Sequence, residues 1–198
     1  MKKTHLIAAS LLALSSTAAL AAEPAPGPWS LILRAAHLDM DNDTDIATLE
    51  AENKTIPDIS IRYALPNNFA AELLLTVPQK HDVKLGGAKI GSFKHLPPTL
   101  FGQYHFDTQS NFKPYVGLGI NYTSISDVKL LGGAADLEDD SWGAAAQIGF
   151  DYKVSQNGFI SVDLKKIYID SDVKVGGTKI GSIDLDPTVF AIGYGFRF

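Results

Sequence analysis

The sequence contains no cysteine, which excludes disulfide bridges, zinc–thiolate centres and cysteine nucleophiles. Basic residues are also scarce, with 17 Lys and Arg against 22 Asp and Glu. A nucleic-acid partner is therefore disfavoured, because such a partner requires a basic face. Beyond the first residues, no apolar run approaches the roughly 18 residues that a membrane-spanning helix needs. The chain is nevertheless 45% hydrophobic, so it is either a soluble β protein or a membrane barrel.

The first 21 residues have the features of a secretory signal peptide. Lys2 and Lys3 form a basic start, and residues 6–14 form an apolar core that is too short for a membrane anchor. Residues 19–21 read Ala-Leu-Ala, a small-x-small cleavage site. We therefore expect residues 1–21 to be removed and residues 22–198 to form one domain.

A tetrapeptide of the type Asp-Val-Lys-Leu recurs every 45 residues, at 82–85, 127–130 and 172–175. The first and third copies continue alike, as Gly-Gly-x-Lys-Ile-Gly-Ser. Repeats of this length are supersecondary units, and turn-forming residues lie between the copies. We interpret each unit as a loop, a strand, a tight turn and a second strand.

Strict two-residue alternation of large apolar with small or polar side chains predicts β-strands rather than helices. The alternating segments are 29–40, 56–65, 69–84, 93–106, 112–129, 141–153, 159–175 and 189–198. We therefore predict an all-β, eight-stranded antiparallel up-and-down barrel with both termini on one side. The long loops are expected at 41–55, 85–92, 130–139 and 176–182.

The second face of these strands distinguishes a membrane barrel from a soluble one. A soluble barrel or sandwich would place Lys and Glu on its outer face, whereas here the second face is mostly Gly, Ala, Ser and Gln. Small residues suit the crowded interior of an eight-stranded barrel. Aromatic residues at the strand ends, among them Trp29, Tyr122 and Trp142, match the interfacial girdles of a barrel that spans a bilayer.

Several motifs, in order along the chain, resemble the OmpW family of bacterial outer-membrane proteins. They are Leu-Pro-Pro-Thr-Leu at 96–100, Lys-Pro-Tyr-Val-Gly-Leu-Gly-Ile-Asn-Tyr at 113–122, Asp-Ser-Trp-Gly at 140–143, Asp-Pro at 186–187 and the terminal Phe198. The resemblance implies an eight-stranded barrel in the outer membrane, with periplasmic termini, associated with passage of small hydrophobic compounds. Alkane-import proteins are similar relatives.

The C-terminal alternation also resembles the signal that the outer-membrane assembly machinery reads. Its residues are Phe190, Ile192, Tyr194, Phe196 and Phe198.

Side-chain parity combined with strand direction predicts an interior that is apolar in its upper half and charged in its lower half. The predicted apolar pocket comprises Leu38, Met40, Leu74, Phe101, Ile167, Ile169, Leu185 and Val189. The predicted charged plug comprises Arg34, Arg62, Glu72, Asp151, Lys153, Asp163, Lys165 and Arg197. Asp58 and Tyr115 are exceptions to this division. Buried charges persist when they are paired, so the lower layer is most simply a seal, with an ion path as the alternative.

Three prolines lie near the starts of descending strands, at Pro97, Pro98 and Pro187. Proline cannot donate to the hydrogen-bond ladder, so it marks either the point where a strand leaves its loop or a weakened wall. A weakened wall would let a ligand leave sideways. The loop residues Ile90 and Ile180 are expected to fold over the pocket mouth.

The sequence therefore predicts a monomeric outer-membrane barrel that contacts lipid and passively admits small hydrophobic molecules. The alternative is a structural or adhesive barrel, with a sealed interior, whose loops bind partners or phage. No Ser, His and acid fall at one inward level on neighbouring strands, so we predict that the protein is not an enzyme. Neither a cofactor nor a metal cluster is indicated.

Overall fold

The computed structural model describes residues 26–40, 49–51, 53–85, 88–130, 135–137, 140–175, 178–184 and 186–198. The predicted signal peptide and Leu185 lie outside these residues. No helix in the described part of the chain is long and apolar enough to cross a membrane. The strands are β1 (Trp29–Asp39), β2 (Leu49–Ala51), β3 (Lys54–Ala64), β4 (Phe69–Thr76), β5 (Gln79–Leu85), β6 (Ala88–Leu96), β7 (Thr99–His105), β8 (Phe112–Leu130), β9 (Ala135–Leu137), β10 (Asp140–Lys153), β11 (Gly158–Ile167), β12 (Asp170–Val175), β13 (Thr178–Asp184) and β14 (Thr188–Arg197).

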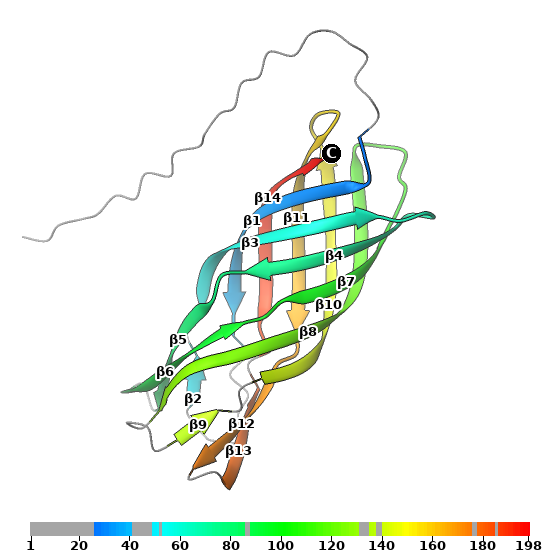
Figure 1. The fold of residues 1–198 in the computed structure, drawn as a ribbon. Helices are drawn as coiled ribbons and strands as arrows, with labels where there is room; N and C mark the ends of the chain where they lie inside the picture. The colour runs from blue at the N-terminus through cyan, green and yellow to red at the C-terminus, as the bar shows by residue number, and fades with distance from the viewer. Residues whose placement is uncertain are drawn as a thin grey trace, which may run out of the picture.

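Eight of these strands form a closed antiparallel ring, which confirms the predicted barrel (Figure 1). The ring runs β1, β3, β4, β7, β8, β10, β11 and β14, and β14 pairs with β1 from Ser30–Arg197 to Asp39–Thr188. The Phe198 amide donates to the Trp29 carbonyl at 2.9 Å, so both ends of the described chain meet at one end of the barrel. We call this the terminal end and the opposite one the loop end.

The loop end is more regular than the sequence predicted. The predicted loops 85–92 and 176–182 are wrong, because most of their residues belong to the hairpins β5–β6 and β12–β13, which extend beyond the ring (Figure 1). Leu85 pairs with Ala88 and Val175 pairs with Thr178, so the backbone satisfies its hydrogen bonds in a ladder. Three predicted strands, 69–84, 93–106 and 159–175, are each divided into two.

The sequence repeat becomes a structural repeat at this end. Asp82 pairs with Ser92 in one hairpin and Asp172 with Ser182 in the other. Both ladders then shift register directly after the valine of the repeat, at a bulge. The second copy of the tetrapeptide instead ends β8, where Leu130 pairs with Gly91 of β6.

The outer surface of the ring is apolar. Leu118 is 75% exposed and Ile148 is 59% exposed, and the exposed face of each strand continues this pattern. Aromatic pairs bound the belt, with Trp29 on Tyr63 at the terminal end and Tyr122 on Trp142 nearer the loop end. This is the surface that a bilayer requires, so the large side chains face lipid as predicted.

The inner face is crowded enough to require glycine. A Cβ atom on Gly193 would lie 1.9 Å from the Leu33 carbonyl oxygen, and one on Gly119 would lie 2.8 Å from the ring of Phe101. Backbone oxygens and packed rings cannot move aside cheaply. At these levels the interior is therefore filled by side chains, as the small second face predicted.

Candidate functional site

Seven charged side chains meet inside the ring in what we call the charged network. Its members are Arg34, Arg62, Lys165, Asp58, Glu72, Asp151 and Asp163. Arg34 is central: its Nε lies 3.0 Å from Asp58 Oδ1, its Nη2 lies 2.8 Å from Glu72 Oε1, and its Nη1 lies 3.2 Å from Asp163 Oδ2. One guanidinium thus serves three carboxylates.

The second arginine links the network toward the terminal end. Arg62 Nε donates to Glu72 Oε2 at 2.8 Å, and its Nη1 donates to Asp151 Oδ2 at 2.5 Å. Its guanidinium also lies 5.0 Å from the ring centroid of Tyr115. Tyr115 in turn donates its hydroxyl to Asp163 at 3.2 Å, which joins the two arginines through a second route.

The strand register explains why these residues meet. Arg34 of β1 is the direct partner of Asp58 on β3, and Arg62 of β3 is the direct partner of Glu72 on β4. Residues that oppose each other on neighbouring strands share a face, and the inward face here is sealed from water. No side chain of the network is more than 12% exposed.

Six of the eight charged residues predicted for the plug lie in this network, and two do not. Lys153 and Arg197 are exposed and line a cavity at the terminal end, so their predicted place among buried ion pairs is wrong. Both have inward parity, but each lies at the last residue of its strand, below the network. Of the two exceptions that the sequence left, Asp58 belongs to the network and Tyr115 contacts it through Asp163.

An apolar layer lies on the loop-end side of the charged network. The predicted residues within the described chain pack in one buried cluster: Leu38, Met40, Leu74, Phe101, Ile167, Ile169 and Val189. Ala36, Ile56, Ala145 and Ala191 complete this apolar cluster, and Ile90 and Val128 pack against it. The order is visible within single strands, since Leu38 follows Arg34 on β1 and Ile56 precedes Asp58 on β3.

One wall beside the apolar cluster is polar, which side-chain parity alone did not predict. Asn121 Nδ2 donates to Thr99 Oγ1 at 2.8 Å, and Thr123 Oγ1 donates to Asn121 Oδ1 at 2.6 Å. All three side chains are buried. Asn121 also reaches the Pro98 carbonyl at 3.3 Å, so this stripe borders the proline pair.

The ladder is interrupted beside Pro97 and Pro98. The β4–β7 ladder ends at the pair Leu74–Thr99, and pairing resumes in the β5–β6 ladder at Gln79–His95. At this seam Thr76 Oγ1 is buried with no hydrogen-bond partner in the described structure. We call the interval between these two pairings, residues 75–78 and 96–98, the proline seam.

A similar interruption lies at Pro187, but side chains bridge it. Asp186 Oδ1 accepts from the Ile169 amide at 2.8 Å, and Lys166 Nζ donates to the Asp186 carbonyl at 2.6 Å. The Ile167 amide still reaches the Pro187 carbonyl at 3.2 Å. Three hydrogen bonds therefore cross the wall at Pro187.

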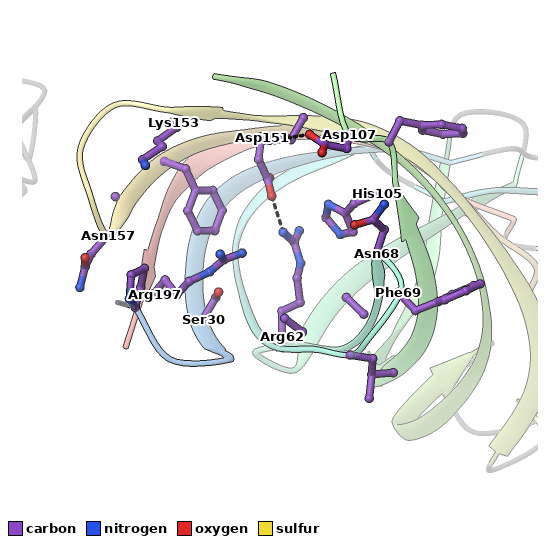
Figure 2. Close-up of a pocket in the computed structure, with 18 of the residues that line it drawn as sticks. Ser30, Arg62, Asn68, Phe69, His105, Asp107, Asp151, Lys153, Asn157 and Arg197 are labelled. Carbon is purple, nitrogen blue, oxygen red and sulfur yellow. Dashed lines mark hydrogen bonds and ion pairs between the residues drawn. The ribbon is translucent and has the colours of Figure 1, made fainter. Parts of the chain in front are cut away.

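A cavity of about 520 Å³ opens at the terminal end, below the charged network. Figure 2 shows the Arg62–Asp151 pair in it, with Lys153 and Arg197 on one side and His105 on the other. Within the part of the chain that the structure describes, no group of three His, Asp or Glu side chains is arranged to hold a metal ion.

Comparison with known proteins places this architecture in one family. The OmpW family model matches residues 33–198. Outer membrane protein W of Vibrio cholerae is 36% identical over 166 residues, which covers 76% of each chain. The crystal structure of OprG from Pseudomonas aeruginosa superposes with a TM-score of 0.74 at 27% identity, covering 87% of this chain and 97% of that one.

The solution structure of Escherichia coli outer membrane protein W superposes with a TM-score of 0.65 at 31% identity, over 87% of this chain and 98% of that one. These relatives are outer-membrane proteins, and the apolar belt of the ring suits the same location. The chain belongs to the OmpW family of outer-membrane β-barrel proteins.

Proposed function

We propose that the barrel gives small hydrophobic molecules a passive route into the outer membrane. A molecule enters at the loop end, lodges among the side chains of the apolar cluster and leaves sideways into lipid. The observation that carries this proposal is the division of the interior, with an apolar cluster directly above a buried charged network. In this proposal the terminal end, with its short turns, faces the periplasm.

The charged network acts as the floor of this route. An apolar molecule gains by contact with Phe101 or Ile169, whereas below them it would displace ion pairs and lose their interaction energy. Net movement toward the terminal end is therefore unfavourable. A molecule that has entered must return or find an opening in the wall.

The proline seam is the exit that we favour. Two prolines remove backbone donors from the strand that borders it, and Thr76 leaves a buried hydroxyl unpaired there. Separating the wall at this place breaks no ladder pair between Leu74–Thr99 and Gln79–His95. Pro187 is a second exit candidate, but the bonds of Asp186 make its wall harder to open.

Polar substitution of the apolar cluster tests the binding step. We expect Phe101→Ser and Ile169→Asn each to reduce uptake of a small alkane or aromatic compound about tenfold, since burying a large apolar side chain is worth about 1.5–3 kcal/mol. Uptake is measured in whole cells and in vesicles, normalised to folded barrel by heat-modifiable gel mobility. Phe106→Ser, at an exposed position of the terminal end, is the matched control. Unchanged uptake in both cluster variants would instead favour a structural or adhesive barrel.

Tethering the proline seam tests the exit. The native chain has no cysteine, so Val77→Cys/Leu96→Cys offers one defined pair for a short thiol cross-linker. We expect cross-linking to abolish most uptake and cleavage of the linker to restore it. Leu33→Cys/Tyr194→Cys, on directly paired residues of the unbroken β1–β14 ladder, is the control. Full uptake through a tethered seam would show that molecules leave elsewhere.

We also propose that the C-terminal strand is the segment that the outer-membrane assembly machinery recognises. Phe190, Ile192, Tyr194, Phe196 and Phe198 all lie on the outer face of the barrel, each about half exposed. Their side chains therefore form a continuous apolar stripe that is accessible before the ring closes. The barrel acts as a monomer in this proposal.

A further inference from the structure

The cavity at the terminal end is built differently from the apolar cluster. It is lined by strand ends and turns, including Ser30, Arg62, His105, Phe159 and Arg197. The charged network lies between this cavity and the apolar cluster. We call this cavity the terminal vestibule.

Positive charge exceeds negative charge in the terminal vestibule. Its lining contains four bases, Arg62, Lys113, Lys153 and Arg197, but only two acids, Asp107 and Asp151. Lys113 is occupied by Asp107, and this hydrogen bond lowers the pKa of Asp107 below its ordinary value. Asp107 therefore stays ionised and holds Lys113.

The remaining three bases have hydrogen-bond donors or charges without a partner among the described residues. Arg62 donates from Nε to Glu72 and from Nη1 to Asp151. Its Nη2 is buried without a hydrogen-bond partner, and its side chain is only 4% exposed. Within the described residues, Lys153 and Arg197 form no ion pair. A buried donor without a partner is costly, and a ligand that accepts its hydrogen bond recovers that free energy.

An apolar surface lies beside these bases. The ring of Phe159 is 5.8 Å from the Arg62 guanidinium. It packs over Gly195, its direct partner on β14, where a Cβ atom would lie 2.2 Å from the ring. The absence of a side chain at Gly195 thus leaves room for the Phe159 ring beside the vestibule.

We propose that the terminal vestibule is a binding site for small carboxylates that carry an apolar group. The carboxylate accepts hydrogen bonds from Arg62 Nη2 and is attracted by Lys153 and Arg197. The apolar group lies against Phe159. Two excess positive charges suit a carboxylate, and the volume of about 520 Å³ holds a ring of benzoate size. This site is independent of the route proposed for hydrophobic molecules, because the charged network lies between them.

Titration of the full barrel with benzoate tests this proposal. In a neutral detergent, we expect saturable shifts of the backbone amide signals of Asn68 and Gly158, two vestibule residues. Lys153→Gln and Arg197→Gln should each weaken binding at least about threefold, within the range for loss of one partly exposed ion pair. Lys80→Gln, which removes the same charge from exposed β5 at the loop end, should leave the affinity unchanged.

Two further ligands separate the contributions of charge and ring. Benzamide has the same shape without the charge, and it should cause no saturable shift at these amides. Inorganic phosphate has the charge without the ring, and it should bind more weakly than benzoate. Equal binding of phosphate would overturn the role of Phe159. Absence of benzoate binding, or binding that both vestibule variants leave unchanged, would overturn the site itself.

Discussion

Replacing Arg34 with methionine is expected to destabilise the folded barrel by about 3–5 kcal/mol, the cost of removing one partner from a buried ion pair. Arg34 contacts three carboxylates, on Asp58, Glu72 and Asp163, and its own side chain is fully buried. Methionine fills similar space but leaves those carboxylates with less positive charge. Urea unfolding in lipid vesicles, followed by the fluorescence of the two tryptophans, measures the loss.

Two comparisons make this measurement specific to the charged network. Arg197→Met makes the same chemical change at an exposed position and should alter stability by less than about 0.5 kcal/mol. Adding Glu72→Gln to Arg34→Met removes one uncompensated charge and should recover part of the loss, because contacting residues are not additive. A single Arg34→Met variant as stable as the parent would mean that the network contributes little to the fold.

Placing arginine at Leu118 is expected to cost about 2–4 kcal/mol, the penalty for a cation at the middle of the lipid-facing belt. Leu118 is the most exposed large apolar side chain of the described barrel, at 75%. It lies on β8 between Phe112 at the terminal end and Tyr122 nearer the loop end. The same vesicle unfolding assay measures this effect.

The control for Leu118→Arg is the same substitution at an exposed residue near the end of the barrel. Val154 follows β10 in a turn at the terminal end and is 48% exposed. Arginine there can reach water, so Val154→Arg should cost no more than about 1 kcal/mol. Equal effects of the two substitutions would contradict a lipid-facing belt at Leu118.

Side-chain parity was enough to predict which residues enter the barrel, but not how deep they lie. Strict alternation fixes the inward face, and Phe101 and Ile169 are buried on it. Depth depends on the stagger between strands, which sequence does not encode locally. That is why Asp58 lies beside Arg34 in the network, whereas Lys153 and Arg197 lie below it.

Other features depend on long-range pairing. The Gly-Gly repeats in the sequence suggested loops, but the bulged ladders of β5–β6 and β12–β13 become visible only when both strands are paired. The polar stripe of Thr99, Asn121 and Thr123 escaped notice because each residue taken singly resembles an ordinary small inward residue. The surroundings of Arg62 likewise come from four other strands, β4, β8, β10 and β11.

The pairing of β1 with β14 has a consequence for biogenesis. These strands come from opposite ends of the chain, so the last ladder of the ring awaits complete synthesis. Until then β1 and β11 each expose an edge with unsatisfied backbone groups, which invites association with other chains. A truncated chain that ends before Thr188 therefore leaves β1 and β11 each with an unpaired edge and cannot close the ring.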